Sequence, residues 1–172
     1  MNMEERKEYY EFRTVRENEA EEAARIEAVC FPPSEACTLP IMKQRVQAAP
    51  ELFIVAEEKS TGRPAGFINA IATDEASLRD AFFTDISLHN PQGKNIMILS
   101  VAVLPQHRGR GLAGAMMREM VKRQKAAGKK AAVLTCLASR IGLYAGMGFA
   151  DRGVSDSSWG GESWHEMVLS FD

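Results

Sequence analysis

A glycine-rich turn at residues 106–113 carries the strongest chemical signal in the sequence. Gly109 and Gly111 let the backbone adopt positive φ and let a ligand approach it closely. The turn precedes a long helical pattern, whose first N–H groups are free and whose dipole is positive at this end. Arg108 and Arg110 add charge. The turn therefore predicts a cradle for an anion such as a pyrophosphate, and the alternative is a plain tight turn.

Residues 109–114 also match the pattern G-x-G-x-x-G, which is typical of dinucleotide-binding folds. That fingerprint needs an acidic residue at the end of the next strand, and the sequence there, Leu-Thr-Cys-Leu-Ala at 134–138, has no carboxylate. The fingerprint also normally opens its fold, whereas this turn lies past the middle of the chain. A Rossmann-like dehydrogenase that binds NAD is therefore a weaker interpretation.

The cysteines and histidines do not have the spacing of a metal site. Three cysteines, Cys30, Cys37 and Cys136, are an odd number without metal-type spacing, which argues against a disulfide scaffold and fits a reduced cytoplasm. None of the three histidines has a ligand partner at useful spacing. We expect no metal and a cytoplasmic location.

Length and charge exclude several classes of protein. The chain has 172 residues and a net charge of -2, so we expect one domain over residues 1–172 and no nucleic-acid partner. The longest apolar runs are too short to span a bilayer, and the N-terminus leads into no apolar segment typical of a signal peptide. We therefore expect no membrane partner.

The elements that must position the turn alternate between strands and helices. We expect strands at residues 10–15, 52–57, 65–72, 95–103, 130–135, 149–154 and 164–171. We expect helices at residues 18–30, 40–49, 111–127 and 139–147, with Asn18 as the first cap. Residues 74–89 fit either a short helix or an irregular insert. This order, with a hairpin near the middle, predicts an α+β fold in which helices cover a mixed sheet.

At these residues the chain resembles the GNAT superfamily of N-acetyltransferases. The acetyl-CoA motif of that family is Gln or Arg, two residues, Gly, one residue, then Gly or Ala, and Gln106, Gly109 and Gly111 match it. Residues 100–103, Ser-Val-Ala-Val, look like the family's splayed central strand. Residues 143–149, Leu-Tyr-Ala-Gly-Met-Gly-Phe, resemble its Tyr-x-x-x-Gly-Phe signature.

The resemblance covers residues 12–171 and is closer to the arylalkylamine (serotonin) N-acetyltransferase branch. Residues 50–52, 88–93 and 102–103, together with Cys136, look like stretches of that branch in the same order. The resemblance implies a single GNAT domain with a mostly antiparallel sheet of about seven strands. Dimers are common in the family, so a homodimer is one assembly that the resemblance allows.

The resemblance also implies acetyl-CoA as co-substrate and assigns roles to residues. Backbone groups of the central strand would bind the pantetheine arm, and N–H groups of the turn would hold the pyrophosphate. These cofactor-binding positions are Val101, Ala102, Val103, Arg108, Gly109, Arg110, Gly111, Leu112 and Ala113. Tyr144 matches the family's general acid, because a phenol with an ordinary pKa of about 10 can protonate the departing thiolate; packing against the cofactor is the alternative.

The general base does not follow the serotonin branch. Met97 and Leu99 stand where that branch has paired histidines, and neither side chain accepts a proton. Glu35 lies in the loop that lines the amine site in this family, so we expect it to attract the ammonium and relay its proton through water; a solvated loop glutamate is the alternative.

The sequence thus predicts an N-acetyltransferase that transfers an acetyl group from acetyl-CoA to a primary amine, by direct attack in a ternary complex. The expected acceptor is a small aralkylamine or polyamine. The alternatives are a protein N-terminal or lysine acetyltransferase, and a non-catalytic acyl-CoA-binding module.

Overall fold

A computed structural model describes all residues of the chain, 1–172. The strands are β1 (Tyr10–Thr14), β2 (Phe53–Glu58), β3 (Arg63–Thr73), β4 (Asn95–Val103), β5 (Ala131–Cys136), β6 (Ala150–Val154) and β7 (His165–Ser170). The α-helices are α1 (Met3–Tyr9), α2 (Ala20–Cys30), α3 (Leu39–Ala48), α4 (Leu112–Ala126) and α5 (Ile141–Gly146). Short 3₁₀ turns join these elements, including η1 (Glu17–Glu19), η3 (Asp80–Phe83), η4 (Ile86–Leu88) and η7 (Trp159–Gly161).

The seven strands form one mixed sheet in the order β1-β2-β3-β4-β5-β7-β6. Every neighbouring pair is antiparallel except β4 and β5, which are parallel. The predicted hairpin is the β2–β3 pair, and the irregular insert after β3 contains η3 and η4. The expected α+β fold is therefore confirmed.

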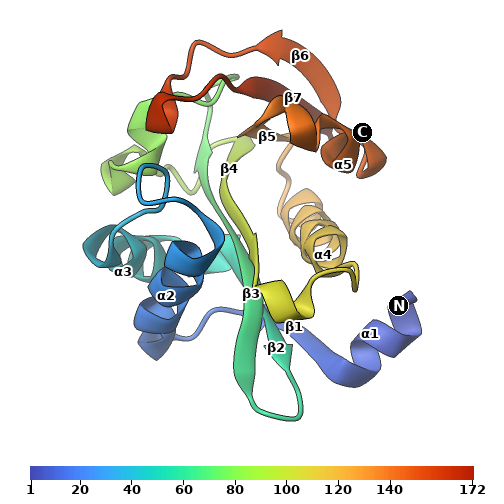
Figure 1. Cartoon of the computed structure of the whole chain (residues 1–172). Helices are drawn as coiled ribbons and strands as arrows, with labels where there is room; N and C mark the ends of the chain where they lie inside the picture. The colour runs from blue at the N-terminus through green and yellow to red at the C-terminus, as the bar shows by residue number, and fades with distance from the viewer.

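Helices cover both faces of the sheet (Figure 1). One core lies between the sheet and α2 and α3, where Ile26 and Met42 pack against Phe53 and Phe67. The other core lies on the α4 face, and its members include Met116, Met117, Met120, Ile54, Ile68, Ile96 and Phe149. The methionines of α4 therefore fill the core, as expected of unbranched, adaptable side chains.

The two N-terminal helices differ from the sequence prediction. Helix α1 was not predicted, because it buries none of its residues and has no apolar stripe, although Asn2 and Glu5 form a capping box at its start. Helix α2 begins at Ala20 rather than at a cap on Asn18. A carboxylate oxygen of Glu19 accepts from the backbone N–H of Arg16 (2.7 Å), so residues 17–19 form a 3₁₀ turn first.

Strands β4 and β5 diverge along their length. Strand β4 pairs with β3 from Asn95 to Val103, but it pairs with β5 only from Asn95 to Met97. Strand β5 pairs along its whole length with β7 on its other side. The second half of β4 therefore has one edge without a strand neighbour, and a gap opens between the two halves of the sheet. None of the helices combines the length and the apolar character that a bilayer crossing requires.

Candidate active site

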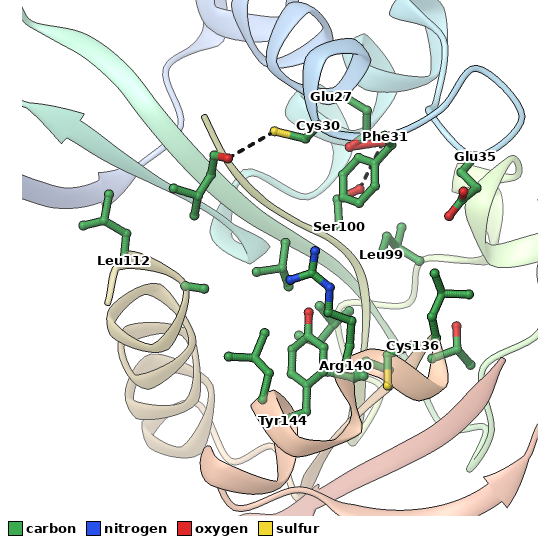
Figure 2. Close-up of a pocket in the computed structure, with 18 of the residues that line it drawn as sticks. Glu27, Cys30, Phe31, Glu35, Leu99, Ser100, Leu112, Cys136, Arg140 and Tyr144 are labelled. Atoms are coloured by element: carbon green, nitrogen blue, oxygen red, sulfur yellow. Dashed lines mark hydrogen bonds between the residues drawn. The ribbon is translucent and has the colours of Figure 1, made fainter. Parts of the chain in front are cut away.

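A cavity of about 560 Å³ occupies the gap between β4 and β5. The second half of β4 and the end of β5 line it, together with the end of α2, the start of α4 and α5. Figure 2 shows Leu112 and Glu35 on opposite sides of this cavity, with Tyr144 reaching in from α5. The cavity therefore connects the glycine-rich turn with the loop between α2 and α3.

The glycine-rich turn has the conformation that its composition predicts. Gly109 has φ 78° and Gly111 has φ 76°, in the left-handed region that favours glycine, and Gly111 is the N-cap of α4. A Cβ atom on Gly109 would meet no atom within 4 Å, so the backbone there faces open space. The free N–H groups at the start of α4 adjoin the cavity through Leu112 and Ala113. This arrangement fits a pyrophosphate, which the backbone and the helix dipole would hold.

The two arginines of the turn differ in position. Arg108 lines the cavity, and its Nε donates to the carbonyl of Val103 (3.0 Å). Arg110 does not line it, because its guanidinium donates to the hydroxyl of Tyr10 (2.5 Å). That hydroxyl is also 2.6 Å from Nδ1 of His107. The guanidinium of Arg110 therefore stabilises the turn and does not face the cavity.

The second half of strand β4 lines the cavity through residues 98–101 and Val103. Val101 and Val103 line it, whereas Ala102 is 1% exposed and lies in the core against α2 and α3. The carbonyl of Val103 accepts from Arg108 and also from the thiol of Cys30 (3.3 Å). The structure thus places Val101 and Val103 at the gap, whereas the predicted cofactor-binding residue Ala102 does not line it, because its side chain points into the core.

Tyr144 stands in the wall that α5 contributes. Its ring packs edge-to-face on Phe149, with 6.0 Å between the ring centroids, and its hydroxyl has no hydrogen-bond partner in the protein. Burial raises the pKa of Tyr144 to about 12, and the neighbouring Cys136 adds to the rise while Arg140 opposes it. The phenol is therefore protonated at neutral pH and can donate into the cavity.

Glu35 lies at the opposite side of the cavity, in an aromatic compartment. The indole N–H of Trp159 donates to the carbonyl of Glu35 (3.2 Å), and the Trp159 ring stacks on Phe83 at 4.8 Å between centroids. Gly160 packs so closely that a Cβ there would lie 2.7 Å from Cγ of Glu35. Burial raises the pKa of the Glu35 carboxyl, and the nearby charge of Glu162 raises it further.

Several residues of the cavity were not predicted from the sequence. Glu27 and Ser100 are both buried and face each other, and Arg140 extends from the start of α5 toward Tyr144 (Figure 2). Arg140 makes no ion pair in the protein. A signal for Glu27 does exist in the sequence, because it shares the buried stripe of α2 with Ala20 and Ala23.

The histidines have structural partners. His89 accepts from the backbone N–H of Ala72 (3.0 Å), and His165 lies 3.2 Å from the carboxylate of Asp151. His107 lines the cavity, but its Nδ1 is held by Tyr10. The structure contains no group of three or more His, Cys, Asp and Glu side chains arranged to hold a metal ion.

Comparison with protein families gives one match. A model of the "Acetyltransferase (GNAT) family" matches residues 16–149, which include the glycine-rich turn and Tyr144. No curated protein matches this chain in sequence.

Solved structures of this fold resemble the chain over nearly its whole length. The GphF GNAT-like decarboxylase in complex with isobutyryl-CoA has a TM-score of 0.81 and 15% identity, with 94% of this chain and 100% of that chain covered. The NatC complex bound to Gag peptide and CoA has a TM-score of 0.73 and 17% identity, with 94% of this chain and 98% of that chain covered. YncA, a putative acetyltransferase from Salmonella typhimurium with acetyl-CoA, has a TM-score of 0.67 and 19% identity, with 95% of this chain and 94% of that chain covered. The TM-scores show that these proteins and this chain share a fold.

Proposed function

The chain belongs to the acetyltransferase (GNAT) family, and we propose that it transfers an acetyl group from acetyl-CoA to a primary amine. Structures of similar fold have been solved with acetyl-CoA or CoA bound, which supports acetyl-CoA as the co-substrate. We further propose a small aralkylamine or polyamine as the acceptor, as in the arylalkylamine branch that the sequence resembles.

The observation that carries the proposal is the continuity of the cavity. It joins an anion cradle at Gly109 and Gly111, an unpaired strand edge at Val101 and Val103, and a phenol at Tyr144. A nucleotide pyrophosphate fits the cradle, and the free edge of β4 offers backbone groups to an extended amide-containing arm. A thioester at the end of that arm would then lie beside Tyr144.

The proposed transfer needs one bond to form and one to break. The lone pair of the neutral amine forms a C–N bond with the thioester carbonyl, and the C–S bond then breaks with its electrons on sulfur. Tyr144 donates its proton to that thiolate and regains one from the amine nitrogen through solvent. The products are an amide and free CoA thiol.

The acceptor compartment favours a small amine over a peptide. The hydrogen bond between Trp159 and Glu35 ties the β6–β7 connection to the α2–α3 loop at this side of the cavity. Phe83 and Trp159 provide a flat apolar wall, and the Glu35 carboxyl offers a partner for an ammonium group. Such a compartment suits an aralkylamine or the cationic chain of a polyamine.

Thiol release from acetyl-CoA tests this function. The purified protein is assayed with a thiol reagent against tryptamine, phenethylamine, spermidine and a lysine peptide. We expect amine-dependent release with a small amine, and about a 100-fold lower kcat in Tyr144→Phe, because a general acid contributes about 10²–10⁴-fold.

Calorimetry with acetyl-CoA is the control for Tyr144→Phe, and we expect an unchanged affinity because only the hydroxyl is removed. A preference for the lysine peptide would support the protein acetyltransferase instead. Tight acetyl-CoA binding without release in any arm would support the non-catalytic binding module.

A further inference from the structure

We propose that Glu27 is the general base of the acetyl transfer. In this role Glu27 takes the proton from the acceptor ammonium, while Ser100 holds the Glu27 carboxylate in place. This inference rests on the proposed function and adds a catalytic residue to it. Met97 and Leu99 cannot accept a proton, so the face of β4 that they occupy offers no base.

The position of Glu27 carries the inference. The residue is 3% exposed on α2, yet it lines the cavity. Its Oε2 accepts from the hydroxyl of Ser100 (3.2 Å) and from the backbone N–H of Cys37 (3.2 Å). Its Oε1 is buried and has no hydrogen-bond partner. Figure 2 shows Glu27 reaching from α2 toward Ser100 on β4, across the cavity from Tyr144.

A buried carboxylate with a free oxygen needs an explanation. Burial of a charge is costly unless the charge is paired, and nearly all buried polar atoms in proteins have a partner. The titratable groups near Glu27 are Cys30 on α2 and Cys37 in the loop, and Arg45 on α3 is near Cys37. Arg45 donates to the carbonyl of Phe83 (2.9 Å) and makes no ion pair with Glu27. A substrate ammonium is therefore the partner that the free oxygen fits.

The two carboxylates of the cavity would then have different tasks. Glu35 is the more exposed of the two and lies in the aromatic compartment, where it attracts the cationic amine. Glu27 is enclosed, and two hydrogen bonds fix its Oε2 in place. These bonds also orient its Oε1 for proton transfer. The proton that leaves the ammonium forms the carboxyl O–H of Glu27, and the nitrogen keeps the electron pair that attacks the thioester.

The test compares Glu27→Gln with Glu35→Gln at saturating acetyl-CoA. Glutamine keeps an oxygen for Ser100 and Cys37 but cannot accept the ammonium proton. With the best alkylamine of the panel, Glu27→Gln should lower kcat about 100-fold or more. Glu35→Gln should mainly raise KM. Both variants should bind acetyl-CoA with wild-type affinity by calorimetry, which also reports whether they fold.

A weakly basic nucleophile separates proton transfer from packing. Methoxyamine is already neutral at pH 7, so it needs no base before it attacks. Its rate with Glu27→Gln should stay within about threefold of wild type, whereas a merely structural role would lower the rates of both nucleophiles equally.

Ser100→Ala provides a second variant in case Glu27→Gln does not fold. Without the hydroxyl that holds Oε2 of Glu27, kcat with the alkylamine should fall about 10-fold, while the methoxyamine rate should stay within about threefold of wild type. Wild-type alkylamine turnover in Ser100→Ala or in Glu27→Gln overturns the inference alone. Wild-type protein without amine-dependent turnover overturns the proposed function and this inference together.

Discussion

Cys136 and Tyr144 both line the cavity, and burial raises the pKa of each group. For Tyr144 the higher pKa is consistent with the proposed role, because a general acid must hold its proton until the thiolate leaves. For Cys136 it opposes nucleophilic catalysis, because the thiolate and not the thiol attacks carbonyls. The nearby charge of Asp151 raises the pKa of Cys136 further. The raised pKa of Cys136 therefore argues against an acyl-enzyme at this residue, in agreement with the proposed direct attack by the amine.

Cys136→Ala tests the absence of an acyl-enzyme. The variant should keep kcat within about threefold of wild type, since its thiol takes no part in the transfer. It should lose about 1 kcal/mol of stability, because the buried sulfur packs against Met167 at 3.5 Å and its removal leaves a small void. The measurements are amine-dependent thiol release and thermal unfolding.

Mass spectrometry gives the complementary result. Wild-type protein mixed with acetyl-CoA in the absence of amine should show no acetyl adduct on Cys136. A stoichiometric adduct that an amine then discharges, together with loss of turnover in Cys136→Ala, would show a covalent route.

Positions in the cavity were predictable from the sequence only where a local motif marks them. Tyr144 and the glycines at 109 and 111 lie within short patterns, and the structure brings them to one cavity. Glu27 becomes visible only when β4 places Ser100 opposite α2, since the two residues are 73 positions apart. Trp159 likewise reaches the site through the contact of η7 with Glu35.

At the scale of elements, the turn before α4 depends on backbone conformation more than on side chains. Gly109 and Gly62 make a matched pair for testing this dependence. Their φ values are 78° and 71°, and a Cβ would meet no atom within 4 Å at either position. Gly62 lies in the β2–β3 hairpin and does not line the cavity.

Gly109→Ala and Gly62→Ala should therefore destabilise the protein equally, by about 1–2 kcal/mol each, which is the cost of the left-handed region for a residue with Cβ. Only Gly109→Ala should also weaken acetyl-CoA binding, by roughly 10-fold, because its methyl group occupies the space in front of the cradle. Thermal unfolding and calorimetry measure the two effects. Equal affinities in both variants would show that the phosphates bind elsewhere.

The elements themselves were largely predictable, because strands and the α4 helix have strong apolar periodicity. Strand β4 was predicted at residues 95–103 and is found there, since it is apolar at nearly every position and buried in the sheet. Helix α1 was not predicted, because its stability comes from its cap and from contacts such as Arg6 with the carbonyl of Arg110 (3.3 Å) rather than from a buried face.

At the scale of the whole molecule, the β4–β5 gap divides the sheet. Three residue pairs, Asn95–Met97 with Ala131–Val133, join β4 to β5, and β6 and β7 are attached through β5. Helix α4 packs beneath both parts, since its methionines contact β2 and β3 on one side and share a core with Leu134 and Phe149 on the other. The cavity is thus built from both parts of the sheet.

A co-substrate that fills the gap should stabilise the fold, because it binds both sides in the native state and has no site in the unfolded chain. At 100 times its dissociation constant, acetyl-CoA should add about 2.7 kcal/mol to the free energy of unfolding. For a domain of this size that corresponds to a rise in Tm of roughly 5–10 °C.

NADH at the same concentration should leave Tm unchanged, since no carboxylate follows β5 to bind its ribose. A shift with NADH and none with acetyl-CoA would contradict the acetyl-CoA site and favour a dinucleotide site, because both predictions depend on the same glycine-rich turn.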